Sequence, residues 1–185
     1  MLLHVDGARL ANAAAALGVP LGALATDAGA DVLSLGATKN GGLLGDAVVF
    51  LDPVRDDLAD RFELIRKQGM QLASKMRFLS AQFDALFGAG ELWRRNAEHA
   101  NAMAARLAAG VEGIDAIEVV HPVEANGVFA ALPRPAIDAL LRDLPGEHPF
   151  YVWDEDADIV RWMCSWDTTE ADVDALIAAA HTAVG

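Results

Sequence analysis

The stretch SLGATKNGGLLGDAVVF, residues 34–50, places a basic residue, Lys39, between two apolar runs. Each run has the length and the apolar content of a buried β-strand. Three of the six residues after Lys39 are glycine, which is typical of a turn. The stretch therefore predicts a strand, a turn that holds Lys39 among buried residues, and another strand over 46–51.

The residues before this stretch predict a strand and a helix that lead up to it. Leu2–Asp6 is a short apolar run that indicates a strand, and Ala8–Leu17 is an alanine-rich run that indicates a helix. Gly18 ends that helix, since glycine with proline close behind is a common helix stop. Residues 21–25 predict a brief helical turn, and 31–35 a second strand. Strand, helix and strand with short connections indicate an α/β fold with a parallel sheet.

The pattern changes to helices, and then to a second mixed region, after residue 52. A helix is expected to begin at Pro53, because proline and acidic residues are favoured in the first turn. Thr168 or Thr169 can cap the last helix. The remaining expected elements are helices over 73–87, 92–109, 135–144 and 169–180 and strands over 117–120, 127–132, 149–153 and 159–164. Residues 113–185 thus predict a compact α/β unit that a long helix links to the first part.

Composition and charge restrict the class of protein. The chain has 185 residues, of which 54% are hydrophobic, so it can bury the core of one domain or of two small ones. Its net charge of −13 argues against nucleic acid as a partner, because binding a phosphate backbone needs clusters of lysine and arginine. No apolar run approaches the ~18 residues of a membrane span, and the start of the chain does not predict a signal peptide.

The chain has a single cysteine, Cys164, which excludes an internal disulfide and a multi-cysteine metal site. The histidines show no metal-ligand spacing, so we expect no metal. These features predict a cytoplasmic protein. Cys164, Trp162 and Trp166 are expected to pack in the core. Because the chain begins within a strand-like run, we expect it to be the later part of a longer protein.

The segment HVDGAR, residues 4–9, ends the first expected strand and begins the first helix. His4 and Asp6 are two residues apart and so project from the same face of the strand, and Arg9 falls in the first turn of the helix. The carboxyl end of a parallel strand is where α/β proteins place groups that contact a ligand. Taken singly, each residue has an ordinary alternative: Asp6 as a helix N-cap, His4 as a core histidine, and Arg9 as a surface ion-pair residue.

Lys39 follows the next expected strand and allows two interpretations. One is a solvated lysine beside an Asn-Gly turn. The other is a nucleophile, because a buried amine beside cations deprotonates readily and can then bond a carbonyl. Enzymes that use pyridoxal phosphate (PLP) combine such a lysine with an aspartate that contacts the pyridine nitrogen. Lys39 and Asp6 together match that pair.

Four segments carry a family resemblance. They are HVDGARLANAAAALGVPL (4–21), SLGATKNG (34–41), RKQGMQLASKMRFLSAQ (66–82) and VRWMCSWDTTEADVDAL (160–176). Together they closely resemble the low-specificity L-threonine aldolases, in the group of aromatic amino acid β-eliminating lyases. The resemblance implies the type I fold of PLP-dependent transferases, which is the aspartate-aminotransferase fold. It also implies retro-aldol cleavage of L-threonine, L-allo-threonine and related β-hydroxy-α-amino acids to glycine and an aldehyde.

The same resemblance implies a role for each cofactor residue. Lys39 would be the catalytic residue that bonds PLP, and Asp6 would keep the pyridine nitrogen protonated. His4 would support Asp6 from behind, and Lys67 would lie near the cofactor. Arg9 would also line the cofactor site.

The resemblance further implies how substrate, domains and partners are arranged. Arg9 and Arg161 would hold the substrate carboxylate. Residues 1–88 would be the C-terminal part of the PLP-binding large domain with the start of the connecting helices. Residues 89–185 would be a connecting helix and the small α/β domain. The protein would be a homo-oligomer, a dimer or a tetramer, and would contact neither nucleic acid nor membrane.

Three alternatives to an active aldolase stay open at this point. The chain could be a non-catalytic fragment that acts only in subunit association, because the resemblance implies a preceding half that supplies the phosphate loop and part of the carboxylate site. It could be another PLP-dependent lyase or an aminotransferase of the same fold. It could also be an α/β protein without a cofactor. Replacing Lys39 distinguishes the last alternative from the PLP hypotheses, since only a PLP protein loses its colour.

Overall fold

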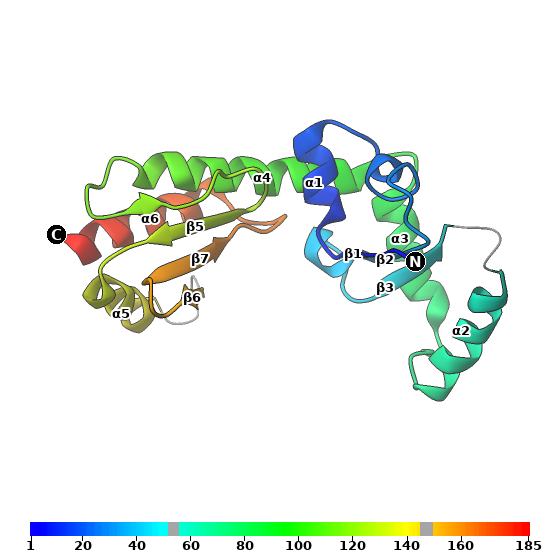
Figure 1. Cartoon of the computed structure of the whole chain (residues 1–185). Helices are drawn as coiled ribbons and strands as arrows, with labels where there is room; N and C mark the ends of the chain where they lie inside the picture. The colour runs from blue at the N-terminus through cyan, green and yellow to red at the C-terminus, as the bar shows by residue number, and fades with distance from the viewer. Residues whose placement is uncertain (52–55, 145–149) are drawn as a thin grey trace. The chain divides into compact units, whose positions relative to one another are not determined.

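The computed structural model describes residues 1–51, 56–144 and 150–185 (Figure 1). They form two compact units, Met1–Ala97 and Glu98–Gly185. The first unit contains a three-stranded sheet of order β1-β2-β3, and the second a four-stranded sheet of order β4-β5-β7-β6. Among these residues, no helix is both long enough and apolar enough to cross a membrane. Both units mix helices with strands, as the sequence predicts.

The elements of the first unit follow the expected order. Gly18 ends α1 in the left-handed conformation, with φ 67°, which confirms the predicted stop. The expected start of α2 at Pro53 lies outside the described residues. In chain order the elements are β1 (His4–Gly7), α1 (Leu10–Leu17), the 3-10 turn η1 (Leu21–Leu24), β2 (Val32–Gly36), the 3-10 turn η2 (Thr38–Asn40), β3 (Asp46–Phe50), α2 (Asp56–Gln68), α3 (Met76–Phe87) and the start of α4 (Leu92–Val111).

The sheet of the first unit is mixed, so the expectation of a fully parallel sheet is wrong for β3. β1 and β2 pair in parallel, and α1 lies between them in the chain. β2 and β3 pair antiparallel, with Gly36 opposite Asp46. Residues 37–45, which join them, form only a short turn, whereas a crossover to a parallel neighbour needs a dozen or more residues. β2 and β3 are also mostly half-buried, although the sequence indicates fully buried strands.

Small residues allow α1 to pack closely in the first unit. Ala11 and Ala14 of α1 form one cluster with Trp93 and Ala97 of α4. Ala14 and Ala97 are fully buried, at 0% exposure, so neither has room for a larger side chain. A second cluster, around Leu10, packs α1 against the sheet. The alanine-rich run predicted from sequence is therefore a packing surface.

The second unit buries one face of its sheet beneath helices. Burial alternates along β5 and β7, as in a sheet with one face on the core. Thr169 caps α6, where it and Asp172 form a capping box, which confirms one of the two expected caps. The expected strand over 149–153 begins at Tyr151, and Pro149 lies outside the described residues. The elements are the rest of α4, β4 (Glu118–Val119), β5 (Gly127–Ala131), α5 (Arg134–Asp143), β6 (Tyr151–Asp154), β7 (Ile159–Met163) and α6 (Glu170–Val184).

The core of the second unit contains two of the three residues expected there. Trp162 is 2% exposed and Cys164 is 4% exposed. Burial raises the pKa of the Cys164 thiol to about 11, so this side chain is an apolar packing group. Trp166 is 40% exposed, and its expected burial is wrong. It lies in the connection between β7 and α6, where the strand alternation that predicts burial has ended.

Candidate functional site

The first unit brings Asp6 and Lys39 to the same edge of its sheet. β1 and β2 run parallel, with Asp6 opposite Ser34. β1 ends at Gly7 and β2 at Gly36, so their carboxyl ends share one edge. Asp6 lies at the end of β1, and Lys39 lies in η2, just beyond β2. Ligands of open α/β sheets bind outside the carboxyl ends of the strands.

The turn after β1 fixes the carboxylate of Asp6. Its Oδ1 accepts a hydrogen bond of 3.1 Å from the backbone N–H of Ala8. The N-cap position of α1 is Arg9, so the alternative in which Asp6 is the N-cap is wrong. Gly7 is needed for close packing at the end of β1, because a Cβ there would lie 2.7 Å from the backbone carbonyl oxygen of Ser34. Asp6 itself is exposed.

Lys39 is exposed in this structure, so the expectation that it is buried is wrong. The physical reason is its position in a 3-10 turn beyond the end of β2 rather than within the strand. The turn closes on Ala37, whose carbonyl oxygen accepts a 2.9 Å hydrogen bond from the N–H of Gly42. A Cβ at Gly42 would lie 2.8 Å from the Cβ of Ala37, so this position also requires glycine.

Asn40 anchors the turn that carries Lys39, and sequence reasoning missed it. Asn40 is 4% exposed, and its Nδ2 donates a 3.0 Å hydrogen bond to the carbonyl oxygen of Trp93. Its own carbonyl oxygen accepts a 2.8 Å hydrogen bond from Nδ2 of Asn96. These bonds join η2 to the first turns of α4. The Asn-Gly pair predicted a turn, but nothing in it distinguishes a buried asparagine from a solvated one.

His4 and Arg9 lie on either side of Asp6 in the chain. His4 is exposed, and its Nε2 shares a 2.9 Å hydrogen bond with Oγ of Ser34 on β2. Ser34 is a further polar group at this part of the sheet, and sequence reasoning did not select it. Arg9 is half-buried at the N-terminus of α1. His4, Asp6 and Arg9 thus enter the site from β1 and from the start of α1.

Lys67 lies in the last turn of α2 and is exposed. The turn that follows contains Met70, which has a positive φ of 59°. Lys67 therefore comes from a different element than the residues at the sheet edge.

Among the residues that the structure describes, no group of three or more His, Cys, Asp or Glu side chains is placed to hold a metal ion.

Arg161 lies in the middle of β7, in the second unit. It is half-buried, and its guanidinium carbon lies 4.8 Å from the centre of the Trp153 ring and 5.9 Å from that of Tyr151. In the parts of the chain described, Arg161 forms no ion pair. These aromatic neighbours were not selected from sequence, since they depend on how β6 pairs with β7.

Known proteins resemble this chain over nearly its whole length. It is 46% identical over 176 residues to a low specificity L-threonine aldolase of Pseudomonas sp., and 45% identical over 166 residues to one of Pseudomonas aeruginosa. These matches cover 95% and 90% of this chain but 49% and 46% of the relatives. The chain therefore spans about half the length of the relatives it matches.

Solved structures confirm the predicted fold class. A threonine aldolase of Leishmania major superposes on all of this chain with a TM-score of 0.80 and 28% identity, and the chain covers 52% of it. A lysine aminotransferase of M. tuberculosis, at 21% identity and a TM-score of 0.59, shares the fold; this chain covers 41% of it. The fold is the aspartate-aminotransferase-like type I fold. Residues 1–133 match the family described as Beta-eliminating lyase, and this chain belongs to that family.

Proposed function

We propose that this chain carries the lysine and the aspartate of a PLP site in a threonine-cleaving lyase. The observation that supports this most is the placement of Asp6 and Lys39 after neighbouring parallel strands at one sheet edge. The L-threonine aldolase names of relatives at 45–46% identity support the substrate class. The proposed reaction breaks the Cα–Cβ bond of L-threonine, L-allo-threonine or a related β-hydroxy-α-amino acid. The products are glycine and an aldehyde.

The chemistry of the donor set fits the cofactor. PLP has an aldehyde that needs an amine and a ring N–H that needs an anionic acceptor. Lys39 would hold the aldehyde through Nζ, and the carboxylate of Asp6 would hold the ring nitrogen. His4 and Lys67 are proposed to contribute from the periphery of the site. When bound, the cofactor supplies a ring that accepts the electron pair left at Cα.

The chain's own residues would orient the substrate and maintain protonation. Asp6 would keep the proton on the ring nitrogen, because an adjacent anion favours a cationic group. Arg9 and Arg161 would bind the substrate carboxylate, a task that suits the planar guanidinium group better than a lysine ammonium. A fixed carboxylate determines which bond at Cα is aligned for cleavage. Nζ of Lys39 would be the group that holds the cofactor between turnovers.

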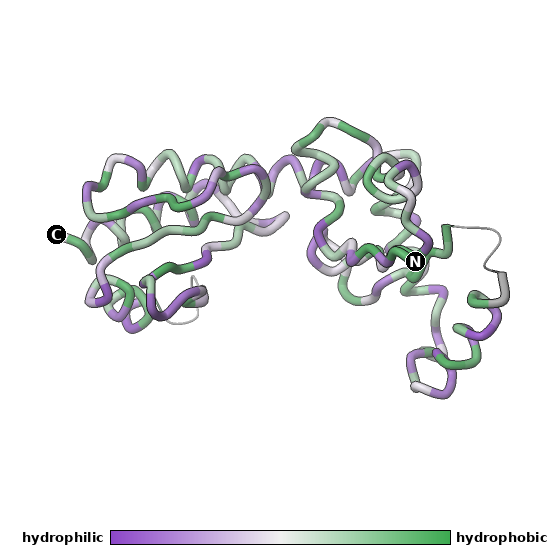
Figure 2. Tube along the Cα trace, in the orientation of Figure 1, coloured by the Kyte–Doolittle hydropathy of each residue, from purple (hydrophilic) through white to green (hydrophobic). Residues whose placement is uncertain are grey.

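We also propose the arrangement of the complete protein. The first unit, Met1–Ala97, would contain the part of the large domain expected over 1–88, and the second, Glu98–Gly185, would contain the small domain expected within 89–185. Exposed apolar side chains on and beside α2 and α3 support a homo-oligomer, because patches of this kind mark protein interfaces. Hydrophobic residues recur along this segment in Figure 2. Those exposed are Leu64, Ile65, Met70, Leu72 and Phe78. A single cysteine supports a cytoplasmic location.

An assay of product release tests the proposed function. The purified chain, with PLP and L-threonine, is expected to release glycine and acetaldehyde in equal amounts, and Lys39→Ala is expected to release neither. Equal release by the Lys39→Ala variant would contradict the role of Lys39. If neither protein releases product, the catalytic part of the proposal fails for this chain, and the three alternatives to an active aldolase are left.

A further inference from the structure

Arg161 differs from the other basic residues of the second unit. The other arginines there form ion pairs: Arg106 with Glu170 and Asp174, Arg134 with Asp138, Glu155 and Asp158, and Arg142 with Asp143. Arg161 has no carboxylate partner among the described residues, although the chain carries 27 acidic residues. An arginine that forms no ion pair in a chain with so many acidic residues is available to bind an external anion.

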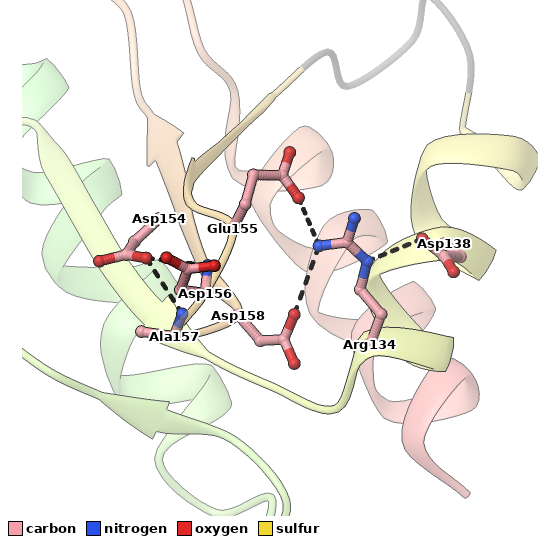
Figure 3. Close-up of polar contacts among 7 residues, drawn as sticks. All are labelled: Arg134, Asp138, Asp154, Glu155, Asp156, Ala157 and Asp158. Carbon is pink, nitrogen blue, oxygen red and sulfur yellow. Dashed lines mark hydrogen bonds and ion pairs between the residues drawn. The ribbon is translucent and has the colours of Figure 1, made fainter.

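Three carboxylates of the turn that precedes β7 are already engaged, as Figure 3 shows. Oδ1 of Asp154 accepts hydrogen bonds of 3.0 Å from the backbone N–H groups of Asp156 and Ala157. Glu155 and Asp158 both contact Arg134 at the start of α5. The turn between β6 and β7 therefore uses these three acidic groups to fix itself and to join α5.

Aromatic rings take the place of a carboxylate beside Arg161. Strand register places Phe129 of β5 and Tyr151 of β6 directly opposite it on either side. Trp153 lies at a register shift between β6 and β7, and such irregularities re-aim side chains. The Trp153 ring lies 4.8 Å from the guanidinium carbon and packs edge-on against the Phe129 ring at 5.3 Å between centres.

This environment holds the guanidinium group without neutralising it. Nε of Arg161 is buried and has no hydrogen-bond acceptor in the described chain. Covering a charged donor in this way costs free energy unless a partner compensates. The faces of aromatic rings compensate in part, since they attract cations. A carboxylate that reaches the same group would add the missing charge and acceptors.

We propose that Trp153 and Tyr151 are positioning residues, whose rings hold the guanidinium group of Arg161 in place to receive a carboxylate. The identity of that carboxylate, as that of a β-hydroxy-α-amino acid, rests on the proposed function. The rings act through Arg161 and do not touch the substrate in this account. Lysine could not replace Arg161, because an ammonium group lacks the flat face that stacks on a ring.

Nuclear magnetic resonance of the arginine Nε–H groups tests this inference on the whole 185-residue chain. The Arg161 signal is assigned by its loss in Arg161→Lys, and the chain is titrated with L-threonine. L-Threoninamide, which lacks the carboxylate, is the control probe. We expect a saturable shift of the Arg161 signal with threonine and none with the amide. Trp153→Leu should weaken binding roughly two- to fivefold, as expected for one cation–π contact.

Two further variants separate positioning from a general loss of structure. Trp153→Phe keeps a ring face and should bind between the wild-type and Trp153→Leu proteins. Trp166→Leu removes an exposed tryptophan that is not one of the rings described beside Arg161, and this variant should bind as the wild type does. Unchanged binding by Trp153→Leu, an equal loss in Trp166→Leu, or an equal response to the amide would each overturn the inference.

The result of this titration can be told apart from the result of a test of the proposed function. PLP attachment at Lys39 in the first unit does not involve Trp153. A chain that attaches PLP at Lys39 but in which Trp153→Leu binds normally keeps the proposed function and loses this inference. A chain that behaves as expected in the titration but attaches no PLP keeps an aromatic-held anion site and loses the proposed function.

Discussion

Nδ2 of Asn40 donates a hydrogen bond of 3.0 Å to the backbone carbonyl oxygen of Trp93, and this bond joins the Lys39 turn to helix α4. The two residues are far apart in the chain, and both are buried, at 4% exposure each. A bond between buried groups is protected from competing water. The position of Lys39 therefore depends on a neighbour that does not itself take part in the proposed chemistry.

Replacing Asn40 is expected to destabilise the chain. Asn40→Ala removes this buried hydrogen bond, whose loss costs about 0.5–1.5 kcal/mol, because the carbonyl oxygen of Trp93 still accepts a hydrogen bond within α4. Urea unfolding measures the loss. Thr38→Ala, at an exposed position of the same turn, is the control and should change the unfolding free energy little. Equal stability of Asn40→Ala and wild type would show that this anchor has no energetic role.

Gly42 is expected to tolerate no side chain. A Cβ there would lie 2.8 Å from the Cβ of Ala37 and 3.1 Å from its carbonyl carbon and oxygen. Gly42→Ala should therefore cost about 1–3 kcal/mol through overpacking. Gly22→Ala is the matched control, because no atom lies within 4 Å of a Cβ at that position. The account of the turn is wrong if the two variants unfold at the same urea concentration.

Cys164 is expected to resist alkylation while the chain is folded. Burial raises its pKa to about 11, so the reactive thiolate is scarce at neutral pH. In the unfolded chain the thiol titrates near its ordinary value of about 8.5. The stabilising contribution is thus present below about pH 8.5 and declines as the pH rises toward 11. Iodoacetamide labelling with and without urea compares the reactivity of the thiol in the unfolded and folded chain. Rapid labelling of the folded chain would contradict the burial of Cys164.

The link between α4 and α6 is expected to weaken in acid. Arg106 donates hydrogen bonds of 3.0 Å and 2.9 Å to the two carboxylate oxygens of Asp174, and these bonds lower the pKa of Asp174. A lowered folded-state pKa stabilises the fold above the ordinary pKa of the carboxyl group, and this contribution disappears as the pH falls through the lowered value. Asp174→Asn should therefore show a smaller loss of melting temperature in acid than the wild type does. An unchanged acid profile would exclude this contribution.

Local sequence patterns predicted most of the elements correctly. Capping and stop signals act within a few residues, which is why Gly18 and Thr169 were found from sequence. The placement of Asp6 and Lys39 at one sheet edge also followed from local signals, because each lies at or just beyond the end of a recognisable strand. The strand β3 was predicted but its antiparallel pairing was missed, although the short connection over 37–45 already excluded a crossover.

Two features that the sequence did not reveal depend on contacts between distant segments, whereas the error at Lys39 has a local cause. The burial of Asn40 depends on Trp93, and no periodicity around Asn40 indicates it. The aromatic environment of Arg161 depends on strand register and on a bulge at Trp153, both of which arise when β6 and β7 pair. Lys39 was expected to be buried because its neighbours are apolar, but the turn lies beyond the strand.

The most direct test of the central claim is the attachment of PLP to Lys39. The chain contains the lysines Lys39, Lys67 and Lys75, and all are exposed. Exposure alone therefore does not favour Lys39, and the other two report non-specific labelling. The purified chain is mixed with PLP and reduced with borohydride, and its peptides are mapped by mass spectrometry. We expect the label to be concentrated on Lys39 and diminished by Asp6→Asn, and equal labelling of the three lysines would contradict the role of Lys39.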